Sequence, residues 1–190
     1  MSAQRLAFLR RRSQAGAVAL PMGGGLGPTM GTAVGSASLA SSAGMDANAW
    51  LIDLSERSAT RFFATPFAQL TAPEQVFVAV WTLEADVNNG GFDQYYLNSS
   101  GDYAWHAPAA LRAIGAEKTA SIAEEANAPF GPDGPPPDRD ARLAAIDKLP
   151  EQVDELWNDC DQAFYAYPDD LTALLSAYVQ THKSEIQGAV

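Results

Sequence analysis

The chain has 190 residues, with 12 Lys and Arg against 23 Asp and Glu, which gives a formal net charge of −11. This excess of acid disfavours nucleic acid and anionic membranes as direct partners, because binding to phosphates requires clustered Lys and Arg. A single Cys excludes an intramolecular disulfide and a Cys-rich zinc site. The sequence contains no uninterrupted run of about 18 apolar residues, so we expect no membrane-spanning helix. We expect a soluble, cytoplasmic domain that holds no metal or other cofactor.

Residues 1–45 differ in composition from the rest of the chain. They contain four Arg and no acid, and residues 16–44 are rich in Gly, Ala and Ser without helical or strand spacing. Such a segment cannot bury enough apolar surface to offset the entropy of ordering, so we predict a disordered leader. A targeting segment and a translation start at Met45 are the alternatives. Residues 46–190 hold all 23 acids and 8 bases, a net charge of −15, and form the predicted acidic domain.

Apolar residues recur with a helical period in about seven segments of this domain. The first segment carries Trp50, Leu51, Leu54, Ser58 and Phe62. Thr71 and Glu74 then have the three-residue spacing of a capping box, with Pro73 in the first turn. The apolar run 76–81 could also be a buried strand, but the cap and the length of the pattern favour a helix. The glycine pair at 90–91 is expected to end it, because glycine readily adopts the left-handed conformation of a helix end.

In the rest of the chain, after the glycine pair, the sequence pattern predicts a short aromatic segment, five further helices and one stiff connection. The helices are expected at residues 104–114, 116–128, 138–149, 151–167 and 169–187. Asp169 is a suitable N-cap for the last of them. Residues 129–137 contain five Pro and two Gly, which predicts a partly extended connection. No pair of alternating apolar runs around a tight turn indicates a hairpin. The predicted fold is all-α, a compact single-domain bundle of about seven helices.

The densest group of polar and aromatic residues lies at 88–102, a segment named here the glycine corner. Its side chains could bind a small ligand or form an enzymatic site together with His106. Alternatively, two helices meet here at a glycine-enabled turn that the aromatic rings anchor in the core. No nucleophile has a base beside it, so we predict no catalytic residue. The residues concerned are Asn89, Gly90, Gly91, Phe92, Gln94, Tyr95, Asn98 and Gly101.

The two His and the single Cys are further candidates for chemistry. Asp102 and His106 are four residues apart and could pair as a base and its orienting group. The favoured alternative is a helix cap at Asp102, with His106 packed near Trp105. His182 lies on an apolar stripe, which predicts a core or interface histidine. Cys160 also lies on an apolar stripe and is expected to be a small buried hydrophobe rather than a nucleophile paired with His. No ligand spacing predicts a metal site.

Acidic residues are densest at 133–170, where 11 acids face three bases, Arg139, Arg142 and Lys148. On the predicted helix 151–167, a turn of about 100° per residue separates an apolar side from an acidic side. Five acids over about 15 Å give roughly one charge per 3 to 4 Å, close to the one phosphate per about 3.4 Å of a DNA strand. The face therefore permits mimicry of DNA, although an acidic solvated face is ordinary. The candidate partner-binding residues are Glu151, Asp154, Glu155, Asp159, Asp161, Asp169 and Asp170.

The glycine corner and its neighbours resemble a known family. The similarity is carried by residues 84–96, which contain the pattern NGGFxQYY, by the sequence NSSGD at 98–102 and by ALRAIGA at 110–116. These blocks resemble the family of the DNA mimic protein C-terminal domain, a bacterial domain of unknown function, over residues 71–126 and more weakly to the C-terminus. The resemblance implies an all-helical dimer whose acidic surface resembles DNA and engages a DNA-binding transcription factor.

Charge and resemblance together predict a non-enzymatic acidic interaction domain. We expect it to occupy the DNA-binding surface of a basic protein such as a transcription factor, and a homodimer is a further expected contact. A ligand-binding or enzymatic site at the glycine corner and a purely structural module are the two alternatives.

Overall fold

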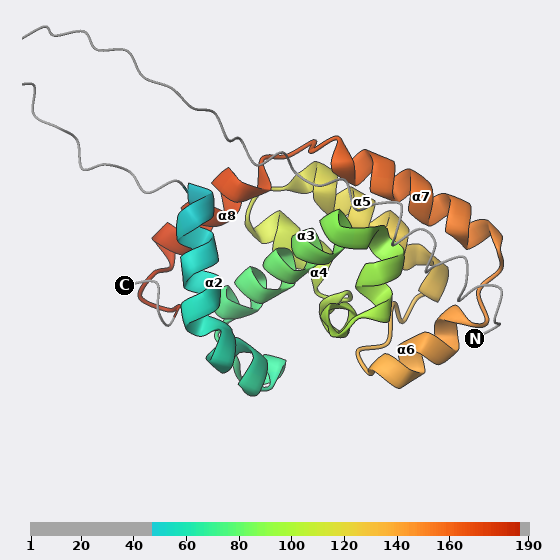
Figure 1. Ribbon diagram of the computed structural model, residues 1–190, viewed down its shortest axis with the longest axis horizontal. Coiled ribbons are helices and arrows are strands. Elements are labelled where there is room, and N and C mark those ends of the chain that lie inside the picture. The colour runs from blue at the N-terminus through green and yellow to red at the C-terminus, as the bar shows by residue number, and fades with distance from the viewer. Residues whose placement is uncertain (1–46, 187–190) are drawn as a thin grey trace, which may run out of the picture.

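A computed structural model describes residues 47–186, and the predicted leader at 1–45 lies outside the described residues. Within that range the chain forms seven α-helices and three 3₁₀ helices and contains no strand (Figure 1). The elements are α2 (Ala47–Ala64), η1 (Phe67–Gln69), α3 (Ala72–Leu97), η2 (Ser99–Tyr103), α4 (Ala107–Ala113), α5 (Glu117–Asn127), η3 (Ala128–Phe130), α6 (Arg139–Ile146), α7 (Gln152–Tyr165) and α8 (Leu171–Thr181). The all-α prediction is confirmed.

Helix α3 crosses the centre of the molecule and packs against α4, α7, α8 and α6 (Figure 1). The predicted capping box begins it, because Glu74 N–H donates to Thr71 Oγ1 at 3.3 Å and Thr71 N–H donates to Glu74 Oε2 at 3.0 Å. The same buried carboxylate accepts from Nε and Nη2 of Arg61 in α2, at 3.0 and 2.9 Å. Glu74 therefore both caps α3 and joins α2 to α3. The run 76–81 is helical, as predicted.

We predicted that the helix would end at the glycine pair, but α3 continues beyond it to Leu97 after a kink. Gly90 and Gly91 leave the helical conformation, with φ of −168° and +79°, but helix resumes at Phe92 in a new direction. The restarted helix is capped from a distant element, because Phe92 N–H donates to Asp161 Oδ1 of α7 at 2.8 Å. A Cβ atom at Gly91 would collide with the Asp161 carboxylate, so only glycine permits both the backbone angle and this approach.

Several other boundaries differ from those predicted. Helix α4 begins at Ala107 rather than at 104, because the 3₁₀ helix η2 precedes it, and α8 ends at Thr181 rather than at 187. The N-cap of α8 is Asp170, whose Oδ1 accepts from Ala173 N–H at 3.0 Å, and not Asp169. The predicted start of α6 is confirmed, since Asp138 Oδ1 accepts from Ala141 N–H at 2.8 Å.

Aromatic side chains from α3 and α7 form the centre of the core. The ring of Tyr96 lies 5.0 Å from that of Trp157, and Phe92 meets Phe164 edge to face at 6.0 Å. The indole N–H of Trp157 donates to the Ala126 carbonyl of α5 at 2.9 Å, which satisfies its one polar group inside the core. Helix α7 is thereby fixed with one side against α3 and α5. None of the helices between residues 47 and 186 has the length and apolar character needed to cross a membrane.

Candidate functional site

The glycine corner is closed from inside by Arg142 of α6, whose side chain is fully buried. Its Nε donates to the Tyr96 carbonyl at 2.8 Å, and Nη1 donates to the carbonyls of Pro136 and Pro137 at 2.8 and 3.1 Å. Nη2 donates to the Asn98 carbonyl at 2.9 Å and to Asp102 Oδ1 at 2.8 Å. Arg142 thus joins the end of α3, η2 and the proline-rich connection. Although it is one of the three bases of the acidic segment 133–170, it lies in the interior and not at the surface.

The side chains of the corner are committed to packing and to backbone support. Tyr95 is 1% exposed, and burial raises the pKa of its hydroxyl well above the usual value. Asn98 Nδ2 donates to Asp86 Oδ1 at 3.1 Å, while Asn89 is exposed. Gly101 lies so close to the Arg142 guanidinium that a Cβ atom there would collide with it. These contacts are those of a packed turn between helices.

Asp102 and His106 form neither the pair that their spacing allows nor the helix cap that we predicted for Asp102. The Asp102 carboxylate binds Arg142 instead, and it does not cap α4, whose N-cap is His106 without a side-chain bond. The His106 ring is exposed and lies 4.8 Å from that of Phe67, and partial burial lowers its pKa. The ligand-site alternative required side chains of the corner to converge with His106. The three surface hollows described are lined by other residues, and Asn89, Gln94, Tyr95, Asn98 and His106 line none of them.

Cys160 and His182 have different surroundings. Cys160 is buried, as predicted, and burial raises the pKa of its thiol to about 12, which disfavours the thiolate that a nucleophile requires. His182 is not a core residue. It follows the end of α8, is half-buried, has its ring centre 4.5 Å from that of Tyr178 in a tilted arrangement, and places Nδ1 2.9 Å from Glu185 Oε1. No group of three or more potential metal ligands is found among residues 47–186.

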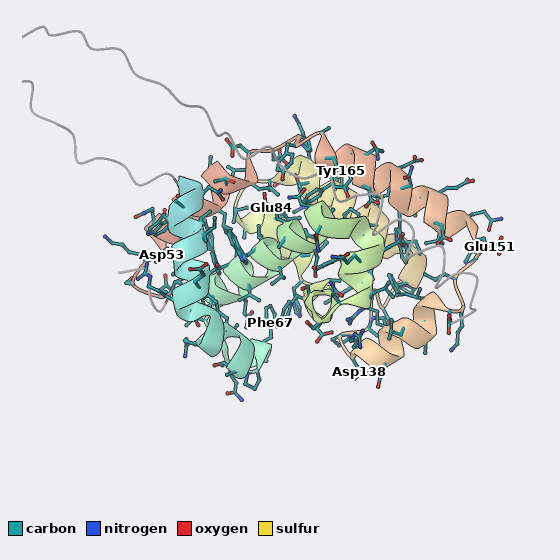
Figure 2. The ribbon with its side chains drawn as sticks, in the orientation of Figure 1. Asp53, Phe67, Glu84, Asp138, Glu151 and Tyr165 are labelled. Atoms are coloured by element: carbon teal, nitrogen blue, oxygen red, sulfur yellow. The ribbon has the colours of Figure 1, made fainter. Side chains whose placement is uncertain are left out.

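The acidic side of α7 is smaller than predicted. Glu151, Glu155 and Asp159 are exposed, and Figure 2 shows Glu151 at the outer edge of the molecule, where α7 begins. Asp154 is half-buried. Asp161 is wrongly assigned to this side, because it is 3% exposed and caps the restarted helix at Phe92. The positions of its neighbours on the helix explain why Asp161 is buried.

Asp161 follows Trp157 by four residues and precedes Phe164 by three, so all three lie on the buried side. The three exposed residues Glu151, Glu155 and Asp159 are named here the α7 acidic face. Four residues of helix span about 6 Å, so this face alone has about half the charge density of one DNA strand.

Asp169 and Asp170 both have structural roles at helix starts. Asp169 Oδ2 accepts from the backbone N–H and the hydroxyl of Thr119 at 2.8 and 3.0 Å, and so it caps α5 rather than α8. Asp170 caps α8 but stays exposed. Both carboxylates therefore lie near the surface while they hold helices in place.

Charge around α7 is nevertheless strongly one-sided. No Lys or Arg occurs at residues 149–182, whereas this stretch contains seven acids. Glu125 of α5, the helix that packs beside α7, is exposed and lies near enough to raise the pKa of the Cys160 thiol, as does Asp159. A surface formed by two helices thus provides more charge than α7 alone. In the segment 133–170, one acid and one base are buried, so the local excess of eight negative charges stays at the surface.

The chain is similar to one known protein family. A family model described as DMP19-like protein matches residues 68–182. The chain belongs to this family. No curated protein and no solved structure matches it. The DMP19-like region runs from η1 into the turn that follows α8 and contains both the glycine corner and the α7 acidic face.

Proposed function

We propose that this DMP19-like chain is a non-enzymatic protein whose acidic surface occupies the DNA-binding face of a basic protein such as a transcription factor. The observation that carries the proposal is the exposed α7 acidic face within a stretch of 34 residues, 149–182, that has no Lys or Arg. A basic partner meets no like charge from this stretch of the chain. Family membership supports the same conclusion.

The position of α7 suits such a contact. The helix lies along the edge of the molecule, and its other side is fixed in the core by Trp157, Cys160 and Phe164 (Figure 1). Its exposed carboxylates are therefore held on a rigid element, so binding costs little ordering of the backbone. Opposite charges would also steer the encounter and make the association rate depend on ionic strength.

The test compares two full-length variants with the same change in charge. The first is Glu151→Gln, Glu155→Gln and Asp159→Asn on the α7 acidic face. The control is Glu56→Gln, Glu117→Gln and Glu185→Gln, which neutralises three exposed acids on or beside other helices. Each tagged protein is used to recover partners from a native lysate, and the recovered protein is then measured for binding to duplex DNA.

We expect the recovered protein to bind DNA, and duplex DNA to compete with the DMP19-like chain for it. The affinity of the α7 variant for this partner should fall at least tenfold, whereas that of the control variant should be unchanged. Binding should also weaken steeply between about 50 and 200 mM salt, since exposed charges are screened. A partner that does not bind DNA, or equal losses in the two variants, would contradict the proposal. The homodimer stays a prediction that sedimentation can test.

A further inference from the structure

A surface hollow of about 390 Å³ lies beyond the C-terminal end of α7. It is bordered by α2, by α3, by the turn after α7 and by the start of α8. Figure 2 shows Glu84 on α3 beside α2 and α8, well separated from Glu151 at the other end of α7. The hollow, named here the Glu84 hollow, is lined by Asn48, Trp81, Glu84, Ala85, Asn88, Tyr167 and Thr172.

One face of α3 forms the floor of the hollow, because Trp81, Glu84, Ala85 and Asn88 follow the spacing that brings helix residues together. Among residues 47–186, no basic residue lines the hollow. Glu84 is half-buried, and no hydrogen bond or ion pair to its carboxylate is formed by the described residues. The charge that acts on its pKa is the like charge of Asp170, so within the part of the chain that the structure describes the carboxylate borders an open hollow and meets no neutralising cation.

Tyr167 is held over the hollow in a specific position. Its φ of +47° is unusual for a residue with a side chain, and it directs the chain sharply away from the end of α7. Asn88 Nδ2 donates to the Tyr167 hydroxyl at 2.6 Å, which orients the amide so that Asn88 Oδ1 is left to accept. The hollow thus combines hydrogen-bond acceptors with the aromatic rings of Trp81 and Tyr167.

We propose that the Glu84 hollow receives an arginine side chain of the bound partner protein. A guanidinium group has five donors in one plane, which suit a carboxylate and an amide oxygen, and its flat face stacks on aromatic rings. Lysine offers a smaller, more strongly hydrated charge and stacks less well. The identity of the partner as a basic protein rests on the proposed function, whereas the chemistry of the hollow does not.

The position of the hollow fits a contact that continues from α7. The 14 residues of α7 span about 20 Å, and the proposal requires that a partner on the α7 acidic face extend past the end of this helix to Tyr167. The charge of Glu84 is disfavoured in the free protein because burial and Asp170 both raise its pKa. The opposite charge of an incoming cation would stabilise the ionised carboxylate against both effects, which favours a positively charged ligand in the hollow.

The test uses the full chain and three short blocked peptides, Gly-Arg-Gly, Gly-Lys-Gly and Gly-citrulline-Gly. Citrulline has nearly the shape of arginine without its charge. Binding is followed by NMR through the indole N–H of Trp81 and the side-chain amide of Asn88. Glu84→Gln and Tyr167→Leu are compared with Glu155→Gln, which makes the same charge change on the α7 acidic face. Spectral dispersion confirms that each variant is folded.

We expect the arginine peptide to shift both signals, the lysine peptide to bind several-fold more weakly and the citrulline peptide to have no effect. Glu84→Gln should weaken binding of the arginine peptide about tenfold, as for loss of a charge-assisted hydrogen bond, and Tyr167→Leu severalfold. Glu155→Gln should leave it unchanged. Equal shifts with citrulline, or equal effects of Glu84→Gln and Glu155→Gln, would overturn the proposal.

The two proposals can fail separately. Specific peptide binding that depends on Glu84, without any DNA-binding partner, would support the hollow and contradict the proposed function. A partner that depends on the α7 acidic face but binds Glu84→Gln as well as the wild-type chain would leave the proposed function in place and overturn the arginine site.

Discussion

The glycine corner is held by specific contacts inside the molecule, although the buried Tyr95 hydroxyl forms no hydrogen bond with the described residues, whereas the side chains of the α7 acidic face extend into solvent. Arg142 alone binds four backbone carbonyls and one carboxylate at the corner. Glu151, at the N-cap of α7, and Glu155 and Asp159 within it are exposed, and their position is set by the helix backbone. The identities of the corner residues are fixed by geometry, and those of the face by charge.

This difference separates the residues that define the fold from those that we propose to define the function. The pattern NGGFxQYY is specific because a glycine at 91 must admit the Asp161 carboxylate and Tyr95 and Tyr96 must fill the core. An acidic surface requires no such pattern, since any exposed Asp or Glu provides the same charge. A strong motif therefore identifies the family and supports the fold, while the proposed contact lies on a helix without a motif.

Replacement of Arg142 should have the largest effect on stability. Arg142→Met removes every donor that the Tyr96, Pro136, Pro137 and Asn98 carbonyls share, and we expect a loss of about 3 to 5 kcal/mol in the free energy of unfolding. Arg142→Lys should recover only part of this, because an ammonium group cannot reach all of these acceptors. Urea denaturation followed by circular dichroism measures both.

Arg139→Met is the matched control for this prediction. Arg139 is in the same helix and is exposed, and its Nε donates only to the Leu97 carbonyl at 2.9 Å. We expect a much smaller loss for this variant. If Arg142→Met cost no more than Arg139→Met, the corner would not be held from inside, and its contrast with the α7 acidic face would disappear.

The coupling between Gly91 and Asp161 should have the next largest effect. Gly91→Ala combines an unfavourable φ of +79° with a collision against Asp161. Gly131→Ala is a control for the angle alone, since φ there is +84° and no atom lies within 4 Å of the added Cβ. We expect about 1 kcal/mol for Gly131→Ala and about 2 to 4 kcal/mol for Gly91→Ala, measured by urea denaturation.

A double-mutant cycle separates the two causes of the Gly91→Ala loss. With Asp161→Ala in the background, the collision is absent, so the additional cost of Gly91→Ala should fall to that of Gly131→Ala. Strictly additive losses would show that the approach of Asp161 does not select glycine at this position.

Local patterns predicted the helices well, and distant contacts explain the errors. The capping box at Thr71 and Glu74 was predictable because both partners lie within one turn. Asp161 is 69 residues from the N–H that it caps, Asp169 is 50 residues from Thr119, and Arg142 is 40 residues from Asp102. Spacing along the chain contains no information about such pairs.

One of these errors could have been avoided from the sequence alone. Asp161 lies between Trp157 and Phe164 on the helical period, so its burial was predictable, although its partner was not. The start of α4 was missed because the 3₁₀ helix η2 has no distinctive composition. The Glu84 hollow was also beyond prediction, because it combines α3 with Tyr167, whose left-handed backbone has no sequence signal.

The smallest expected effect concerns Glu84, which is half-buried and, like the α7 acidic face, forms no ion pair with the residues that the structure describes. Because burial and Asp170 raise its pKa in the folded protein, ionised Glu84 opposes folding. Glu84→Gln should therefore increase the free energy of unfolding at pH 7 by a few tenths of a kcal/mol, the size of one surface charge interaction. Glu155→Gln, on the exposed face, should change it less.

The pH dependence gives the sign of this effect. The difference between Glu84→Gln and the wild-type chain should be largest above the raised pKa of Glu84 and should disappear below about pH 4, where the group is protonated in both the folded and unfolded chain. Urea denaturation at several pH values measures it. A stabilising difference that persists at low pH would have another cause, such as packing of the amide. A destabilising difference at pH 7 would mean that Glu84 already has a favourable partner, and the hollow would then resemble the corner rather than a site open to a cation.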